Sequence, residues 1–540
     1  MTVESDSGSG EAPDLRPSGS AVPHSSGGAA SRWPSVGSAV KLPRVPTKSP
    51  NPMIPSPSRT LADLERRLAY DLACLNEPPG SWPGTLDGPD GFPMLDALVV
   101  GGGMCGLVAA AALQRRGLTR LRIVDRSAEG TEGPWVTYAR MRTLRSPKHL
   151  AGPALGLPAL TFRAWFEAQW GEQAWEALDR IPRTQWMDYL RWYRRVLDLP
   201  VENRVSAVAV EPVPGGLAVR LNGPVRRETV HARRLILATG REGIAVPRRP
   251  AWSAALPADR VWHTSEAVDF PAMAGRAVAV IGYGASAFDN AAEALEAGAA
   301  SVVLLARQPE MPRVNKFKGI VYPGFTLGYP TLAPADRWRV LTYLFDAKIA
   351  PPRAAVLRVF DDPRFAAATS ADVTAADWQD DRVVLRSTAG RFEVDHLILG
   401  TGFKIDLAGS PLLAPVADRI ATWRRLVTPP PHQADHEFLD FPDLGPGFEL
   451  QSRIEGDLPW LRRIHAFTFA AALSHGSVSG DIPAVSDGAN RLADAVAAAE
   501  FREELAHHEE ALRTFDDPEL SIEDVARLRP PPASISDVAD

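Results

Sequence analysis

Two glycine-rich turns, each directly after an apolar run, constrain the fold of this chain more than any other feature. The first turn is Gly101–Gly106 after Ala97–Val100, and the second is Gly282–Ala287 after Val278–Ile281. In such a turn the first glycine permits a tight passage from strand to helix, and the second lets the backbone approach a pyrophosphate. A third small residue lets the helix pack on the strand, so that the phosphates meet the helix N-terminus. The sequence therefore predicts two dinucleotide-binding units, with these expected contacts: Gly101, Gly103, Gly106, Gly282, Gly284, Ser286 and Ala287.

The residues that end the next predicted strands carry opposite charges. Asp125 follows Leu121–Val124, where a carboxylate accepts hydrogen bonds from a ribose with free hydroxyls, as in FAD or NAD. Arg307 follows Ser301–Ala306, where a cation suits the 2′-phosphate of NADPH. The first site is therefore predicted to hold FAD and the second NADPH, while the alternative that Arg307 only ends a surface strand stays open.

Composition excludes several other classes of protein. The 540 residues have a net charge of -6, which argues against a nucleic-acid binder. No apolar run approaches the ~20 residues that a membrane helix needs and no signal-peptide pattern is present, so we expect a cytoplasmic protein without a membrane partner. Only Cys74 and Cys105 are present, without a Cys-x-x-Cys pair, which excludes a dithiol mechanism.

The two halves of the chain repeat one plan. Leu235–Gly240 and Leu397–Gly402 share the form Leu-Ile-Leu-x-Thr-Gly, and each follows a polar β-hairpin. The predicted fold class is α/β, with two Rossmann-like domains and a helical insertion between them at about 332–366. This helical insertion is expected to lie as a lid or wedge between the cofactor domains. The expected segments are a Ser/Gly/Pro-rich disordered extension (1–58), an N-terminal helix and linker (59–94), a first FAD-binding part (95–270), an NADPH-binding domain (271–395), a second FAD-binding part (396–512) and a tail (513–540).

These motifs, in this order over roughly 95–505, resemble the class B flavin-dependent monooxygenases. Further matching pieces are Gly133–Trp135, Ala238–Gly240 and Thr401–Phe403. Within that superfamily, Met141–Lys148 is similar to the FAD-dependent urate hydroxylases and the L-aspartate N-hydroxylases that form nitrosuccinate. The Baeyer-Villiger fingerprint is absent, because no Phe-x-Gly precedes His263, and ketone-to-ester chemistry is therefore in doubt.

The resemblance implies an NADPH-dependent monooxygenase that uses O2 and a C4a-hydroperoxyflavin to oxygenate a small anionic metabolite. We expect N-hydroxylation of L-aspartate toward nitrosuccinate in secondary metabolism, as in antibiotic biosynthesis, with urate hydroxylation as the alternative. An FAD/NADPH reductase that passes electrons to a protein partner is the competitor from another class, and a non-catalytic flavoprotein is a third. The sequence leaves open whether the chain forms a homo-oligomer.

Side chains beyond the glycine turns complete the predicted site. Trp135, Gly240, Gly402 and Asp481 are expected beside the cofactors. Arginine clamps a carboxylate or a purine edge through two parallel hydrogen bonds, so cations near the predicted cleft are candidate substrate ligands, although each would also fit a solvated surface. These candidates are Arg142, Arg145, Lys148, Arg313 and Lys316. No catalytic residue is assigned, with Asn315 as a candidate to orient an oxygen intermediate. No metal site is predicted, although His432 and His436 have a metal-like spacing.

Overall fold

The computed structural model describes residues 60–529, so the predicted disordered extension at 1–58 lies outside the described residues. The first sheet has the order β3-β2-β1-β6-β5-β4, and β17 pairs with β6 beyond the end of β5. Strands β3, β2, β1, β6 and β17 run parallel, whereas β4 and β5 form an antiparallel hairpin on β6. The bounds are β1 Leu95–Val100, β2 Leu121–Asp125, β3 Val201–Asn203, β4 Ser206–Val213, β5 Gly216–Asn222, β6 Arg227–Leu237 and β17 Ile464–Ala466.

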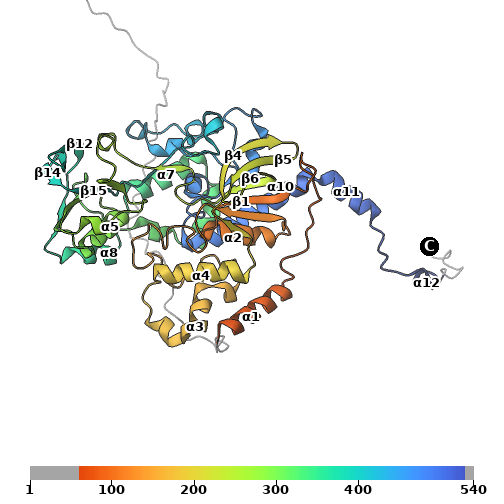
Figure 1. The fold of residues 1–540 in the computed structure, drawn as a ribbon. Coiled ribbons are helices and arrows are strands. Elements are labelled where there is room, and N and C mark those ends of the chain that lie inside the picture. Colours follow the sequence, from red (N-terminus) through yellow and green to blue (C-terminus); the bar gives the residue numbers. More distant parts are fainter. Residues whose placement is uncertain (1–59, 530–540) are drawn as a thin grey trace, which may run out of the picture. The chain divides into compact units, whose positions relative to one another are not determined.

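Helix α2 (Met104–Gln114) lies against this sheet, as Figure 1 shows beneath β1. The helix is rich in alanine, and Ala109, Ala110 and Ala112 have no exposed surface. Small side chains let the helix axis come close to the strands, whose Leu98 and Val99 are equally buried. A sheet covered on both faces needs strands that are largely apolar, and β1 meets that need from Ala97 to Val100.

The second sheet has the order β11-β10-β9-β15-β8, with all its strands parallel. Helix α5 (Ala285–Glu296) follows the second glycine turn and packs on β9 and β10. An antiparallel sheet, β12-β13-β14, and a small pair, β7 with β16, complete the strands. The bounds are β7 Ala245–Pro247, β8 Val261–His263, β9 Ala277–Ile281, β10 Ser301–Leu305, β11 Phe365–Ala368, β12 Val373–Gln379, β13 Arg382–Ser387, β14 Gly390–Val394, β15 His396–Leu399 and β16 Phe403–Ile405. The predicted fold class, α/β with two Rossmann-like units, is confirmed.

Helices α1 (Leu61–Cys74), α3 (Phe162–Ala177) and α4 (Arg183–Val196) precede the second sheet. Thr60 caps α1, since its hydroxyl accepts a hydrogen bond of 3.1 Å from the amide of Asp63. The tryptophan-rich helices α3 and α4 form core, with Trp175 and Trp186 fully buried. Trp170 of α3 differs from these two, because it is 46% exposed.

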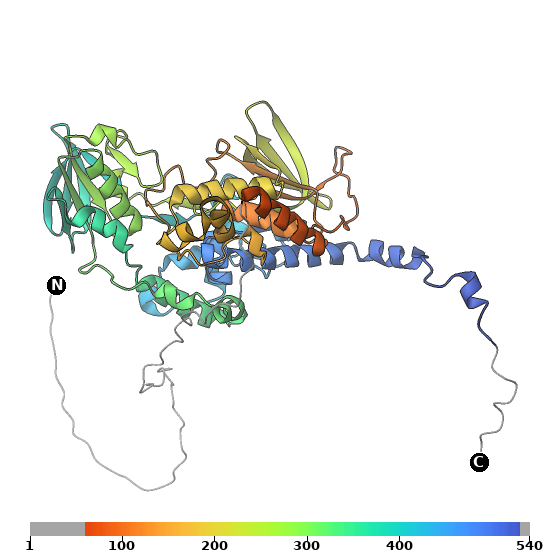
Figure 2. The same cartoon turned by 90° about the horizontal axis from the view of Figure 1, so that it is seen from below.

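Helices α6 (Pro323–Gly328), α7 (Pro334–Asp346) and α8 (Arg353–Phe360) occupy the chain between β10 and β11. The two longer helices belong to different cores. Trp338 and Leu341 of α7 lie in the hydrophobic core that contains the first sheet, whereas Val359 of α8 lies in the core around α5. In Figure 2 the green helices of this insertion lie beside the blue C-terminal part, and the hydroxyl of Tyr329 donates to the carbonyl of Leu473.

The chain after β16 returns to the first sheet through β17. Helices α9 (Ala472–His475), α10 (Val485–Glu503), α11 (Leu505–Thr514) and α12 (Ile522–Val525) follow, and α10 packs on α2. Within residues 60–529, no helix combines the length and the apolar character needed to cross a membrane.

Candidate functional site

The first glycine turn has the close backbone approaches that exclude larger residues. Gly101 has a φ of 110°, and a Cβ on it would lie 2.5 Å from the carbonyl oxygen of Ala238. A Cβ on Gly106 would lie 1.7 Å from the carbonyl oxygen of Gly101. Both contacts are far inside van der Waals distance, so glycine is required where α2 meets the end of β1.

The N-terminus of α2 is open for an anion. Gly103 is the N-cap residue and no side chain caps the helix, so its first amides keep their hydrogen-bonding capacity. A Cβ on Gly103 would come no closer than 3.8 Å to any atom, which leaves space above the turn. The helix dipole adds a partial positive charge at this point, and a pyrophosphate fits it.

Asp125 lies beside this turn at the end of β2. Its carboxylate is 8% exposed and accepts hydrogen bonds of 2.7 Å from the amides of Gly102 and Ser127. A carboxylate offers about four acceptor positions, so Asp125 keeps capacity for ribose hydroxyls. The position and chemistry of this residue therefore fit the adenosine end of a dinucleotide.

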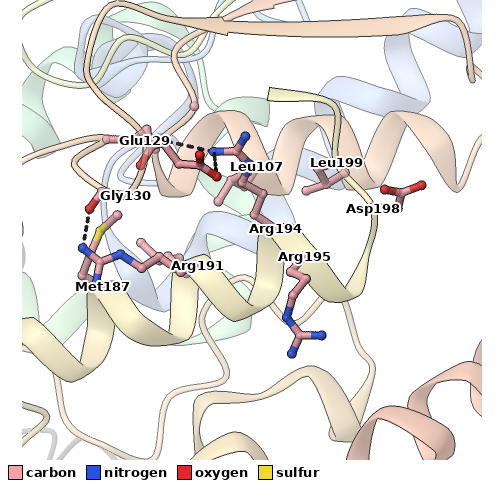
Figure 3. Close-up of a pocket in the computed structure, with 13 residues that line it drawn as sticks. Leu107, Glu129, Gly130, Met187, Arg191, Arg194, Arg195, Asp198 and Leu199 are labelled. Carbon is pink, nitrogen blue, oxygen red and sulfur yellow. Dashed lines mark hydrogen bonds and ion pairs between the residues drawn. The ribbon is translucent and has the colours of Figure 1, made fainter. Parts of the chain in front are cut away.

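A pocket of about 580 Å³ opens next to Gly102 and Gly103 (Figure 3). Helix α4 forms one wall with Met187, Leu190, Arg191, Arg194 and Arg195. These residues are not among those predicted from the sequence. A signal was present, because Arg191, Arg194 and Arg195 follow one another at the spacing of a single helix face.

Glu132 holds the inner wall of that pocket in place. The side chain is 3% exposed and accepts hydrogen bonds from Asn203 Nδ2 at 2.6 Å and Arg194 Nη1 at 3.1 Å. Glu129 lies 3.7 Å from the same guanidinium, and Arg191 donates to the carbonyl of Gly130 (Figure 3). The pocket cations are thus neutralised by protein groups, which suits an uncharged adenosine better than a phosphate.

The other residues predicted beside the first cofactor lie around the same turn. The Trp135 ring contacts Trp186 edge to face, with centroids 6.2 Å apart. Gly240 follows β6 with a φ of 69° and open space around its missing Cβ. Burial raises the pKa of Cys105, at the start of α2, to about 12, and the charge of Asp481 adds to that rise. Asp481, which precedes α10, therefore lies near the start of α2. The Cys105 thiol therefore stays protonated.

The second glycine turn repeats the geometry of the first. Gly282 has a φ of 112°, and a Cβ on it would lie 2.5 Å from the carbonyl oxygen of Gly400. Gly284 is the N-cap of α5 and has no atom within 4 Å of a built Cβ. Ala287 is fully buried, and its Cβ is 2.8 Å from the position of a Cβ on Gly400. The N-terminus of α5, with Ser286 in its first turn, therefore offers an anion the same geometry as the N-terminus of α2.

Gly402 lies two residues after Gly400, between β15 and β16. It has a φ of 76° with open space around it, and its carbonyl is 3.0 Å from Nε2 of the fully buried His263.

Arg307 is exposed after β10 and has no hydrogen bond or ion pair with any residue in 60–529. Burial raises the pKa of the Tyr283 phenol, and the charge of Arg307 opposes that rise, so the two groups lie within electrostatic range. Tyr283 is the second residue of the glycine turn. A free cation at this place fits a 2′-phosphate.

A smaller pocket, of about 310 Å³, adjoins Tyr283. Arg313 and Lys316, which the sequence analysis assigned to the substrate, line it together with Lys348 from the connection between α7 and α8. Lys348 is not among the residues predicted from the sequence. Lysine is rare in this chain, which was a signal, but no motif near Lys348 links it to the second glycine turn.

The other predicted substrate cations lie apart from this pocket. Arg142 is an exposed residue whose guanidinium pairs with Glu296 at 2.9 Å. Lys148 is buried, donates to the carbonyls of Trp175 and Glu176, and lies over the Trp175 ring. Arg145 is half-buried and donates to the carbonyl of Ala350. The structure therefore does not bring the five predicted cations together.

Arg145 lies near acidic residues that belong to both glycine units. Burial lowers the pKa of its guanidinium, and the charges of Asp289 and Asp481 oppose that change. Asp289 belongs to α5, and Asp481 lies near the start of α2. Arg145 therefore lies within electrostatic range of both predicted cofactor sites.

The remaining candidates have structural partners. The Asn315 side chain accepts from the amide of Phe317 and caps a short helical turn, Lys316–Ile320. The His436 ring packs against Trp338 and Phe438. No group of three or more metal-ligating side chains occurs in the part of the chain that the structure describes.

Comparisons with known proteins agree with this architecture. Residues 98–325 match the family described as pyridine nucleotide-disulphide oxidoreductase. The chain is 39% identical over 466 residues to the FAD-dependent urate hydroxylase of Xanthomonas campestris pv. campestris, covering 85% of this chain and 97% of the relative. Ornithine N-hydroxylase from Kutzneria sp. 744, solved with reduced FAD, NADP+ and L-ornithine, has a TM-score of 0.59 at 19% identity over 76% of this chain and all of its own. L-Lysine 6-monooxygenase from Pseudomonas syringae has a TM-score of 0.56 at 20% identity over 75% of this chain and 99% of its own.

The chain belongs to the class B flavin-dependent monooxygenases. It is therefore an oxidoreductase, and the predicted cofactors, FAD and NADPH, are confirmed at the level of the family. The dithiol chemistry in the name of the matching profile does not transfer, because Cys74 is exposed on α1 whereas Cys105 is buried at the start of α2.

Proposed function

We propose that this protein hydroxylates urate, or a closely similar purine anion, with NADPH and O2 as co-substrates. The observation that carries this proposal is the 39% identity to a FAD-dependent urate hydroxylase along 97% of that relative. The predicted first choice, N-hydroxylation of L-aspartate, gains no support of this kind and stays a prediction. The structural likeness to N-hydroxylases, at 18–20% identity, supports the fold alone.

The first glycine unit would hold FAD. Its pyrophosphate would lie at the N-terminus of α2 over Gly103, with the ribose hydroxyls on Asp125 and the adenine in the pocket beside Glu132. Trp135, Gly240 and Asp481 would border the rest of the cofactor. The proposed FAD domain comprises residues 95–270 and 396–512, and the return of β17 to β6 supports that division.

The second glycine unit, residues 271–395, would hold NADPH. Its pyrophosphate would lie at the N-terminus of α5 over Gly284, and Arg307 would bind the 2′-phosphate. Gly282, Ser286, Ala287 and Gly402 would form the surrounding backbone surface.

We assign the substrate anion to Arg145 among the predicted cations. It is half-buried, lies within electrostatic range of Asp289 and Asp481, and donates to one backbone carbonyl, that of Ala350. Arg142 instead pairs with Glu296 at the surface, and Lys148 is buried and donates to two α3 carbonyls. A guanidinium can bind a planar oxo-anion through two parallel hydrogen bonds. A bound reduced flavin activates O2, and the chain orients the substrate and excludes water.

The test is to follow NADPH oxidation by the FAD-loaded protein with urate, with L-aspartate and with neither, and to measure product mass. The proposal expects urate to stimulate NADPH oxidation and a product heavier by one oxygen atom. Stimulation by aspartate alone, with an N-hydroxylated product, would overturn the assignment to urate. NADPH oxidation that neither compound stimulates, together with reduction of an added electron-acceptor protein, would favour the reductase.

A further inference from the structure

We propose that Lys348, on the connection between α7 and α8, binds a phosphate group of the nicotinamide dinucleotide, so that the helical insertion forms part of the second cofactor site. This inference rests on the proposed function, because it takes the second glycine unit as the NADPH site. It assigns a residue outside the Rossmann unit to dinucleotide recognition. It also moves Arg313 and Lys316 from the substrate to the cofactor.

The charges of the smaller pocket support an anionic ligand. Arg313, Lys316 and Lys348 line it, and Glu310 is the acidic side chain that lines it with them. Within residues 60–529, none of the three cationic side chains has a hydrogen-bond or ion-pair partner. Most other arginines around the two sites have such partners, as Arg142, Arg194 and Arg358 do. Three unneutralised cations on one pocket repel one another, and a bound phosphate would relieve that repulsion.

Packing holds Lys348 and Lys316 at the same pocket. Phe317, next to Lys316, contacts Phe345 edge to face with centroids 5.0 Å apart. The amide of Lys348 donates to the carbonyl of Phe345 at 3.1 Å, directly after the end of α7. Lys348 has a φ of 55°, the left-handed region that ends a helix sharply and turns the chain aside. The contact between Phe317 and Phe345 therefore holds the segments that bear the two lysines together.

The insertion reaches this pocket from the first core. Phe345 also packs on Phe438 and Phe469, with centroids 4.8 Å and 5.9 Å apart, and these rings belong to the C-terminal part of the FAD side. Ala350, two residues after Lys348 in the same connection, accepts a hydrogen bond from the guanidinium of Arg145 through its carbonyl. Tyr283, from the second glycine turn, also lines the pocket. A ligand in this pocket would thus contact both cores at once.

The position of the pocket favours a dinucleotide phosphate over the anionic substrate. One wall is Tyr283, inside the turn that receives the pyrophosphate. Another wall is the loop 308–316, which continues from the end of β10, where the adenosine ribose of a bound dinucleotide lies. Both walls belong to the ribose and phosphate end of the cofactor.

The test compares Lys348→Asn with the wild-type holoenzyme. Asparagine tolerates the left-handed backbone and removes the charge. Lys318→Asn is the matched control, because Lys318 is an exposed lysine of the neighbouring turn that does not line the pocket. NADP+ is titrated into each oxidised FAD-loaded protein, and the KM for urate and the Kd for FAD are measured alongside.

We expect Lys348→Asn to weaken NADP+ binding about tenfold, with Lys348→Arg close to wild type and Lys318→Asn unchanged. The loss should shrink at high salt, as it does for a partly exposed charge pair. Equal NADP+ binding by wild type and Lys348→Asn would overturn the inference, and so would a change confined to the KM for urate, which would return the pocket to the substrate. A wild-type protein that fails to bind NADP+ at all would instead overturn the proposed function.

Discussion

The Asp125 carboxylate accepts a hydrogen bond of 2.7 Å from the amide of Gly102, which joins the end of β2 to the first glycine turn. The same carboxylate accepts from Ser127, so its orientation is set before any ligand binds. This preorganisation is what a ribose-binding acid requires, because ordering the side chain costs nothing further on binding.

Asp125→Ala should therefore weaken FAD binding by one to two orders of magnitude, since charged hydrogen bonds contribute about 1.5–3 kcal/mol. Asp125→Asn should lose less, because its amide oxygen still accepts from Gly102. Fluorescence titration of the apoprotein with FAD measures both. If both variants bind FAD as tightly as wild type, Asp125 does not hold the ribose.

Gly106→Ala should destabilise the fold by about 3 kcal/mol, because the new methyl group would overlap the carbonyl oxygen of Gly101 at 1.7 Å. Gly103→Ala is the matched control, since its Cβ would have no neighbour within 3.8 Å. We expect the control to unfold like wild type in urea but to bind FAD more weakly, because its methyl group would enter the space for the pyrophosphate. A stable Gly106→Ala protein would contradict the packing described for α2.

Arg307→Ala should lower the preference for NADPH over NADH at least tenfold. The reason is that Arg307 has no partner within the described chain and only the 2′-phosphate distinguishes the two cofactors. The ratio of kcat/KM values for NADPH and NADH is the measurement, and the Kd for FAD serves as an internal control. An unchanged ratio would return Arg307 to the role of a surface arginine at the end of a strand.

Acid should destabilise the protein through His475. This ring is 3% exposed, stacks on Phe448 and bonds the carbonyl of Gly445, and burial lowers its pKa to about 3. The unfolded chain takes up a proton below pH 6.5, and the folded chain does not do so until about pH 3. Stability should thus be full above pH 6.5 and fall as pH decreases below it, by roughly 1.4 kcal/mol per pH unit for this group.

Urea unfolding at several pH values checks this sign. The slope between pH 6.5 and 4.5 should be smaller in His475→Gln by about one proton, whereas His432→Gln, at an exposed position, should keep the wild-type slope. A wild-type slope in His475→Gln would mean that His475 is accessible to protons in the folded protein.

Local sequence patterns predicted the elements that depend on neighbours in the chain. The strand, glycine turn and helix at Gly101 and at Gly282 formed as expected, because turn chemistry and apolar runs act over a few residues. The contacts that long side chains make in the folded protein could not be predicted from local patterns. Lys148 donates a hydrogen bond to the carbonyl of Trp175, and Lys348 lines the same pocket as Lys316. Both positions result from packing between segments that are distant in sequence. Charge alone indicated candidate ligands, and tertiary contacts decide which cations remain free.

The most direct test of the account is oxygen transfer to urate under 18O2. The holoenzyme, NADPH and urate are mixed under labelled oxygen, and NADPH, urate and the labelled product are counted together. We predict one product molecule carrying one 18O atom for each NADPH and each urate consumed, the second oxygen atom leaving as water. Consumption of NADPH with hydrogen peroxide as its only oxygen product, at a rate that urate does not alter, would contradict it.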